Sequence, residues 1–338
     1  MLPSSAEQLD IEDGPALVSY LRAEGWLEAG EEPRVAALAG GVSNRTVLVE
    51  RAGGGWVLKQ ALERLRVPVV WSSDPARVHR EAAALRILGA LLPPGSVPGF
   101  VFEDGRHCLL CMDAVPMPHE NWKQKLLSGR VAEAELEQFG SLLGVIHRES
   151  GRCLAELAEF ADRRFFESLR LEPYYLFTAE HVPTAAPFLE RLVVETRAVA
   201  VCLVHGDYSP KNVLVRDGRL VLLDHEVAHL GDPAFDLGFS LAHLLSKARH
   251  LPASTDELAA GALRYLAAYR SEVAGFVWPE LERRAVRHTL ACLLARVRGR
   301  SQLEYLDVDE RDDQEAAVLR LLPAPPATVA ALAEGFLS

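Results

Sequence analysis

The chain has 338 residues, of which 49% are hydrophobic and 25% are charged, and its formal net charge is −11. This composition supplies enough apolar side chains for one or two packed domains, and it is not that of a disordered chain. The acidic balance disfavours a nucleic-acid partner, which needs a basic face to neutralise phosphates. No apolar run approaches the ~18 residues of a membrane span, which disfavours a membrane partner.

The expected location of the protein is the cytoplasm. The N-terminus, from Met1 to Glu7, has no basic stretch ahead of an apolar one, so we expect no secretory signal. Five cysteines are an odd number in a long chain, and a disulfide framework is therefore not expected either. The sequence gives no indication of the oligomeric state.

The first part of the chain, residues 1–112, predicts a small lobe that is rich in β-strand. The expected elements are a helix, two strands, a second helix and two further strands, over residues 9–29, 35–51, 55–60, 74–92, 99–103 and 107–112. We expect Asp74 to cap the second helix, with Pro75 at its first position.

Residues 113–119 contain prolines and no hydrophobic period, which is typical of a hinge between two lobes. Residues 120–338 are helical in pattern, except for a β-rich and turn-rich insertion over 201–226. The sequence therefore predicts an α+β fold with a small β-rich N-terminal lobe and a large, mainly helical C-terminal lobe.

The insertion contains a predicted β-hairpin that gathers polar side chains. Apolar runs at 213–215 and 220–223 flank Asp217-Gly218, a pair typical of a two-residue turn. With that turn, Arg216 faces Arg219, and Asn212 faces Leu223 and so lies beside Asp224. An amide oxygen next to a carboxylate suits Mg²⁺ and leaves coordination positions for phosphate and water.

Asp207 precedes Asn212 by five residues, on the loop that enters the hairpin. A carboxylate there is placed to orient or deprotonate an attacking hydroxyl group. The spacing Asp-x-x-x-x-Asn, followed by a hairpin and a metal-binding Asp, is the layout of a kinase catalytic loop.

A second motif overlaps the end of this hairpin. His225-Glu226-x-x-His229 matches the zinc hydrolase pattern, which requires both histidines on one face of a helix. A strand before the motif and Gly231-Asp232-Pro233 after it leave no room for that helix. We therefore favour a role for Glu226 near the Asp224 metal site, and keep the zinc hydrolase as an alternative.

The motifs together resemble the aminoglycoside phosphotransferase / choline kinase superfamily, whose fold is protein-kinase-like. They are His205-Gly206-Asp207, Asn212, Asp224 and the segment Gly231–Leu237. The resemblance implies that Asp207 is the catalytic base and that Asn212 and Asp224 hold Mg²⁺. It also implies that Asp236 braces the catalytic loop, while Asp232 is expected to cap the following helix.

The resemblance further implies an ATP site in residues 1–112, which makes that lobe the nucleotide-binding one. Gly40 and Gly41 would form a turn over the phosphates, and Lys59, paired with Glu81, would bind the α- and β-phosphates. Adenine would contact the backbone where the last strand enters the hinge. The implied nucleotide contacts are Gly40, Gly41, Ser43, Asn44, Lys59, Glu81, Met112, Asp113 and Val115.

The expected function is an ATP- and Mg²⁺-dependent kinase for a small molecule with a hydroxyl group. Residues 59–62, 80–82, 119–129 and 224–226 partly resemble methylthioribose kinases, although Asn212 stands where that subfamily has Ser. Arg296 and Arg298 are candidates for contacting a polar or anionic acceptor; alternatively they are surface ion pairs, and Trp122 is expected in the core. A catalytically silent binding protein with the same fold is the other alternative.

Overall fold

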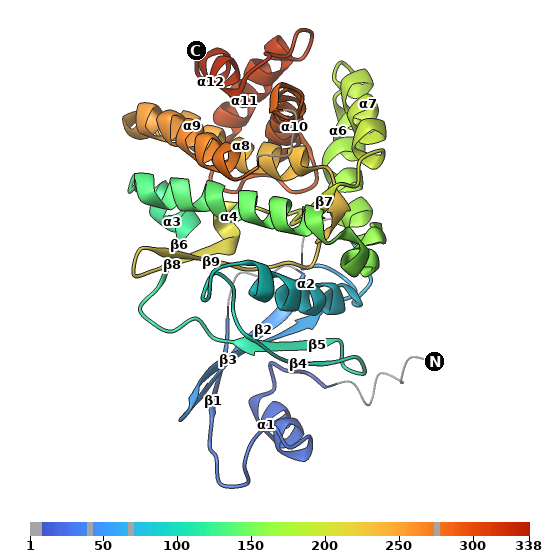
Figure 1. Ribbon diagram of the computed structural model, residues 1–338, viewed down its shortest axis with the longest axis vertical. Helices are drawn as coiled ribbons and strands as arrows, with labels where there is room; N and C mark the ends of the chain where they lie inside the picture. Colours follow the sequence, from blue (N-terminus) through green and yellow to red (C-terminus); the bar gives the residue numbers. More distant parts are fainter. Residues whose placement is uncertain (1–8, 39–42, 67–70, 274–277) are drawn as a thin grey trace.

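The computed structural model describes residues 9–38, 43–66, 71–273 and 278–338. It consists of a small lobe built on a β-sheet and a larger, mainly helical lobe (Figure 1). This confirms the predicted α+β architecture with two lobes of unequal size. None of the helices in these ranges combines the length and the hydropathy that a transmembrane span requires.

The small lobe is an antiparallel sheet of five strands in the order β1-β2-β3-β5-β4. The strands are β1 (Arg34–Ala37), β2 (Asn44–Arg51), β3 (Gly54–Ala61), β4 (Phe100–Asp104) and β5 (Leu109–Asp113). Alternate residues of β5 face opposite sides, since Leu109 and Cys111 join one apolar cluster and Leu110 and Met112 another.

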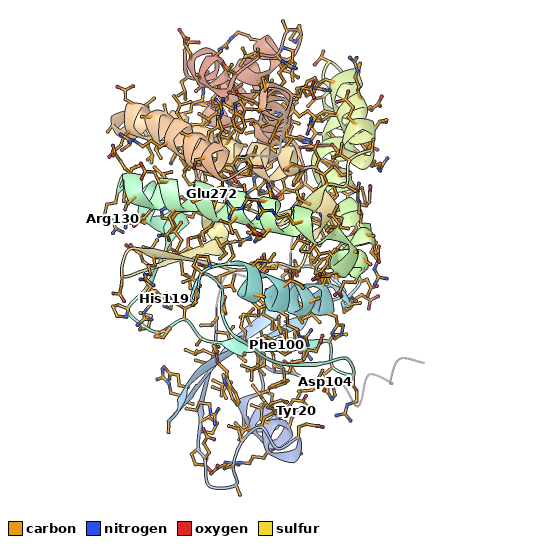
Figure 2. All side chains as sticks on the ribbon, in the orientation of Figure 1. Tyr20, Phe100, Asp104, His119, Arg130 and Glu272 are labelled. Atoms are coloured by element: carbon orange, nitrogen blue, oxygen red, sulfur yellow. The ribbon has the colours of Figure 1, made fainter. Side chains whose placement is uncertain are left out.

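One helix covers each face of this sheet. Helix α1 (Gly14–Ala23) packs on the side of Cys111 through Leu17 and Leu21. Tyr20 of α1 also donates a 2.7 Å hydrogen bond to Asp104 at the end of β4 (Figure 2). Helix α2 (Arg77–Leu91) packs on the other side.

Both helices are shorter than the sequence predicted. The end of α1 comes before residue 29, because its C-cap Glu24 is followed by Gly25 with φ of 77°, a conformation that leaves the helix. The start of α2 is Arg77, and its N-cap is Ala76, so the prediction of Asp74 as the cap is wrong. The Asp74 side chain accepts instead from the N–H of Ala76, which closes a separate turn ahead of the helix.

The chain crosses to the large lobe through residues 114–119, which form no helix or strand; His119 lies on this crossing (Figure 2). The first elements of the large lobe are β6 (Glu120–Asn121), α3 (Trp122–Leu127) and α4 (Glu133–Arg152). A 3₁₀-helix η1 (Leu154–Ala161), α5 (Arg164–Phe166), the π-helix η2 (Glu167–Leu176), α6 (Phe177–His181) and α7 (Ala186–Arg197) follow.

The β-rich insertion comes next, with β7 (Cys202–Val204), the 3₁₀-turn η3 (Pro210–Asn212), β8 (Val213–Arg216), β9 (Arg219–Leu222) and β10 (His229–Gly231). The chain ends with α8 (Pro233–His250), η4 (Pro252–Ser254), α9 (Thr255–Glu272), α10 (Trp278–Arg298), α11 (Val308–Leu321) and α12 (Val329–Leu337).

The core of the large lobe depends on close helix contacts at two glycines. A Cβ at Gly140 of α4 would lie 2.1 Å from the carbonyl oxygen of Tyr265 on α9, and one at Gly238 of α8 would lie 2.3 Å from the Cβ of His288 on α10. Only glycine allows these two helix pairs to approach so closely. Trp122 is fully buried in this core, as predicted.

The hairpin forms in the predicted register. Arg216 faces Arg219 and Val213 faces Leu222, and the N–H of Leu223 donates to the carbonyl of Asn212 at 2.9 Å. Asp217 and Gly218 have φ of 51° and 72°, the left-handed values of a two-residue turn that matches strand twist. Asn212 and Asp224 are therefore delivered to the same open end.

Candidate active site

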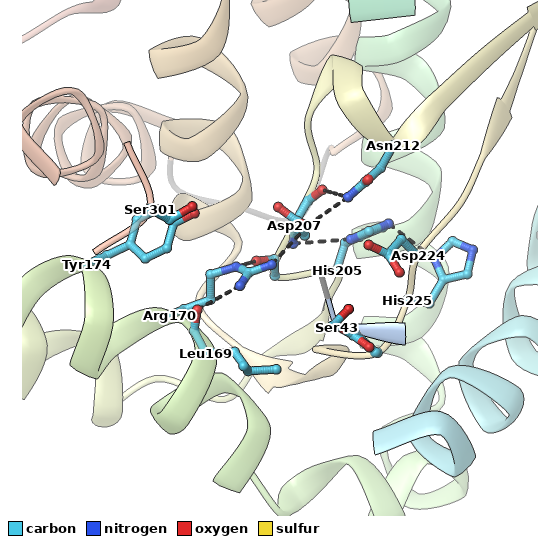
Figure 3. Close-up of polar contacts among 12 residues, drawn as sticks. Ser43, Leu169, Arg170, Tyr174, His205, Asp207, Asn212, Asp224, His225 and Ser301 are labelled. Carbon is cyan, nitrogen blue, oxygen red and sulfur yellow. Dashed lines mark hydrogen bonds and ion pairs between the residues drawn. The ribbon is translucent and has the colours of Figure 1, made fainter. Parts of the chain in front are cut away.

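The catalytic-loop residues predicted from spacing lie in direct contact. The Nδ2 of Asn212 donates to the Oδ2 of Asp207 at 2.7 Å (Figure 3). The same Oδ2 atom lies 2.9 Å from Nη2 of Arg170, which comes from η2. Asp207 is thus held by one amide and one guanidinium group.

Arg170 is a residue that the sequence analysis missed. Its Nε donates at 2.6 Å to the carbonyl of Gly206, so the guanidinium contacts both the backbone and the side chain of the catalytic loop. It lies in a π-helix, a wide turn often found at functional sites. No sequence signal marks it, because it lies outside the loop motif and reaches the loop only in the fold.

Asp236 supports the catalytic loop from beneath. Its two carboxylate oxygens accept from the N–H groups of His205 at 2.7 Å and Gly206 at 2.8 Å, and His147 lies 3.2 Å away. Burial acts to raise the pKa of Asp236, but the bonds from His147 and the loop hold that pKa below its usual value. Asp232 caps α8 by accepting from Ala234, as predicted.

We expect Asp236→Asn to lower the free energy of unfolding by about 2–4 kcal/mol, because an amide nitrogen would face a buried backbone N–H. Urea unfolding at neutral pH measures the change. The control is Asp309→Asn, an exposed residue that also lies in the first turn of a helix, and its effect should stay within about 0.5 kcal/mol. Equal stability of the two variants would contradict the bracing role.

Three carboxylates gather next to the catalytic loop. Glu81, Asp224 and Glu226 each offer an oxygen, and these oxygens lie within 4.8 Å of one another. The Nζ of Lys59 bridges two of them, at 2.7 Å from Glu81 and 2.7 Å from Asp224. Glu81 was expected to pair with Lys59, and the structure adds Asp224 as a second partner.

The electrostatics of this group fit a divalent cation. Burial acts to raise the pKa of Asp224, but the ammonium groups of Lys59 and Lys211 outweigh it and hold that pKa well below its usual value. Burial raises the pKa of Glu81 to about 7 against the charge of Lys59. The Oε2 of Glu81 is buried and has no partner among the described residues, as expected where a further cation belongs.

Glu226 connects the two lobes. Its Oε2 accepts from Nδ2 of Asn44 at 3.1 Å and lies 3.2 Å from Nε of Arg77. Arg77, fully buried and also unforeseen, donates further to the carbonyls of Ser43 and Leu62. Asn44 therefore contacts the cluster of Glu81, Asp224 and Glu226, which we call the metal group because its oxygens could hold a cation, and Ser43 lies beside Asn44. Gly40 and Gly41 are outside the described residues.

Part of the hinge backbone is already hydrogen-bonded to the small lobe. The N–H of Asp113 donates to Gly99 at 2.8 Å, and the N–H of Ala114 donates to Gly55 at 2.9 Å. Met112 is buried against α2. The N–H of Val115 makes no hydrogen bond to any described residue.

The geometry contradicts the zinc hydrolase alternative. His225 lies between β9 and β10, outside any helix or strand, and His229 lies on β10, so the two do not share a helix face. The His225 ring contacts His205 at 3.1 Å, and the His229 ring stacks on Phe166. Within the described part of the chain, the metal-competent group includes Glu226 and neither histidine.

The two candidate arginines of α10 point in different directions. The Nε of Arg298 donates to Glu315 of α11 at 2.7 Å, and its Nη2 pairs with Asp312, so Arg298 forms the surface ion pairs expected as the alternative to an acceptor contact. One helical turn is 3.6 residues, and a step of two therefore changes the face. Arg296 lies on the other side and donates to Tyr174 at 2.8 Å.

Known proteins share this fold. An amicoumacin kinase solved in complex with AMP-PNP, Ca²⁺ and Ami is 15% identical, with a TM-score of 0.61 over 92% of this chain and 94% of that one. The apoenzyme of a macrolide 2′-phosphotransferase from Brachybacterium faecium is 20% identical, with a TM-score of 0.53 over 92% and 98%. These similarities confirm the protein-kinase-like fold.

A sequence relative agrees with the partial resemblance noted above. A methylthioribose kinase from Escherichia coli O45:K1 (strain S88 / ExPEC) is 26% identical over 245 residues, which are 64% of this chain and 58% of that protein. The match therefore spans less than two thirds of the relative.

The profile of the phosphotransferase enzyme family matches residues 34–282, from β1 into α10. This range contains Lys59, the Asp207–Asn212 loop and Asp224, together with the elements that position them. Since the match covers most of the chain and the whole of the site, the chain belongs to the phosphotransferase enzyme family.

Proposed function

We propose that the protein is an ATP- and Mg²⁺-dependent kinase that transfers the γ-phosphoryl group to a hydroxyl of a small molecule. The observation that carries the proposal is the Lys59 bridge to Glu81 and Asp224, next to the Asp207–Asn212 pair. Phosphoryl transfer needs three kinds of group: a cation that binds the phosphates, carboxylates that bind a metal ion, and a carboxylate that orients the acceptor hydroxyl.

Each residue has a distinct part in the proposed reaction. Asp207 aligns the acceptor hydroxyl and accepts its proton as the phosphoryl group is transferred. Arg170 and Asn212 hold the Asp207 carboxylate in one orientation, which places the acceptor oxygen in line. The ammonium group of Lys59 gives up part of its contact with Glu81 and Asp224 and binds the α- and β-phosphates instead.

Asp224 and Asn212 would hold Mg²⁺, with Glu226 near the ion. The ion would neutralise the negative charge that builds up on the phosphates during transfer. Ser43, Asn44, Asp113 and Val115 are proposed nucleotide contacts, with Val115 donating to the base. The complex of the amicoumacin kinase with AMP-PNP and Ca²⁺ supports a nucleotide and a divalent cation in this fold. The cytoplasmic location and the lack of nucleic-acid and membrane partners stay predictions.

The test is ADP release with Mg²⁺, ATP and a panel that includes methylthioribose, aminoglycosides, choline, sugars and amino alcohols. We expect turnover with at least one class, a product heavier by one phosphoryl group, and a loss of kcat/KM of at least ~10²-fold in Lys59→Met. The matched control is Lys125→Met, because Lys125 also pairs with a buried glutamate, Glu135, but lies on α3 away from the metal group. Nucleotide binding without turnover on any class would instead support the silent binding protein.

A further inference from the structure

Basic side chains gather in the large lobe where α3 packs against η3 and α8 packs against α10, and burial and their mutual charges lower the pKa values of Lys123, His243 and Lys247. They come from four separate elements, and we call them the basic cluster: Lys123 of α3, Lys211 of η3, His243 and Lys247 of α8, and Arg296 of α10. Four of the five are Lys or Arg, in a chain whose net charge is −11 and which has five lysines. The proposed function gives no role to any of them.

Direct contacts connect the basic cluster to Asp207. The Nη1 of Arg296 donates to the hydroxyl of Tyr174 at 2.8 Å, and the Tyr174 ring lies 5.7 Å from the guanidinium of Arg170. Arg170 in turn pairs with Asp207. Figure 3 shows Tyr174 and Ser301, the two side chains bound by Arg296, on one side of Arg170 and Asp207.

Lys211 joins the basic cluster to the loop from the other direction. It lies between Asp207 and Asn212 in sequence, and its carbonyl accepts from the side chain of Asn121, at the start of α3, at 2.7 Å. Lys211 is therefore the member of the basic cluster that belongs to the loop between Asp207 and Asn212 itself, tied through its backbone to the start of α3. The basic cluster is thus linked to Asp207 from two directions, through Tyr174 and Arg170 and through the loop itself.

The positive charge of the basic cluster is poorly compensated. Lys211, Lys247 and Arg296 form no ion pair with a carboxylate of the described residues, whereas Arg298, two residues on, pairs with two. Lys123 pairs with Glu304, a largely exposed residue. The Nε of Arg296 is buried and has no hydrogen-bond partner in the described parts of the chain.

Buried cations without counter-charges are unfavourable. Lys247 is fully buried, with its Nζ 3.2 Å from the carbonyl of His243 and 5.2 Å from the ring of Tyr305. Burial and the charges of Lys123 and Arg296 lower the pKa of Lys247 to about 7. The charged forms of Lys247, Lys123 and Arg296 become stable here when a bound anion supplies the missing negative charge.

We propose that the basic cluster binds an anionic group, a carboxylate or a phosphate, on the acceptor whose hydroxyl meets Asp207. The inference rests on the proposed function and narrows its substrate class to hydroxylated anions. A polycationic acceptor would meet like charges here, and such juxtapositions are strongly unfavourable at desolvated sites. Arg296 is the side chain that orients the anion, because hydrogen bonds from its Nη1 to Tyr174 and Ser301 fix the plane of its guanidinium group.

The first experiment uses inorganic phosphate as the probe, with Mg·AMP-PNP saturating the nucleotide site so that phosphate cannot enter there. Calorimetry should give saturable binding of one phosphate to the wild-type chain. We expect Arg296→Gln to weaken this binding by at least ~10-fold, the usual size for a lost bond to a charged group. Arg298→Gln, on the same helix, should bind phosphate like the wild type.

A second variant, Lys247→Met, tests the same proposal in case Arg296→Gln does not fold. Lys247→Met removes a buried charge and leaves no donor unsatisfied, so it should fold, and it should also weaken phosphate binding. Absence of phosphate binding in the nucleotide-bound wild type, or an equal loss in Arg298→Gln, overturns the inference. Failure to bind Mg·AMP-PNP would instead overturn the proposed function.

A kinetic experiment separates the two anionic sources with acceptors that share one ring. D-glucuronate, D-glucose 6-phosphate, D-glucose and D-glucosamine differ in charge, and each is tested as a substrate and as a competitor of phosphate binding. We expect one of the two anions to compete at least ~10-fold better than the neutral and cationic sugars, and to lose that advantage in Arg296→Gln. A preference for D-glucosamine would contradict the inference even where phosphoryl transfer occurs.

Discussion

We expect Asp207→Asn to lower kcat by at least ~10²-fold while leaving the affinity for Mg·ATP within about threefold. The reason is that the substitution keeps the size of the side chain but removes its ability to take a proton. The nucleotide contacts proposed for Lys59 and Val115 lie on other elements and are unaffected. Steady-state kinetics with the best acceptor, together with calorimetry of AMP-PNP, measure the two quantities.

The control for this substitution is Asp217→Asn, in the turn of the hairpin that follows Asp207. Asp217 is exposed and adopts a left-handed φ of 51°, which asparagine tolerates well, so kcat should be unchanged. Turnover close to wild type in Asp207→Asn would refute the assignment of Asp207. A parallel loss of nucleotide affinity would indicate a collapsed loop in place of lost chemistry.

The second large effect concerns Asp224. We expect Asp224→Ala to abolish the increase in AMP-PNP affinity that Mg²⁺ produces in the wild type, because the carboxylate is the proposed link between the cation and the hairpin. Without Mg²⁺, the variant should bind AMP-PNP at least as well as the wild type, since one charge that repels the triphosphate is gone.

Calorimetry with and without Mg²⁺ separates these two cases. Glu103→Ala is a suitable control, because Glu103 also lies in an ion-pair network, with His79 and Arg86, but on β4 and outside the metal group. Its response to Mg²⁺ should match the wild type. A normal Mg²⁺ response in Asp224→Ala would remove Asp224 from the metal site.

Local features of the fold and the site were predictable because they depend on residues close in sequence. The turn at Asp217-Gly218 sets the hairpin register by its left-handed backbone, and that register alone brings Asn212 beside Asp224. The five-residue spacing from Asp207 to Asn212 likewise closes within one loop. Helix boundaries were less predictable. The Asp74 side chain, for example, accepts a hydrogen bond from the N–H of Ala76 in a turn before α2 and does not cap the helix.

The sequence by itself determined the two-lobed α+β order, the hairpin and the loop that presents Asp207, because local backbone preferences and hydrophobic periods encode them. Only the tertiary structure decided which distant cations meet these carboxylates. Lys59 reaches Asp224 from 165 residues away and Arg77 reaches Glu226 from 149 residues away. Arg170 reaches Asp207 from the separate helix η2. It also separated Arg296 from Arg298, because long side chains meet partners that depend on how whole helices pack, which no local pattern records.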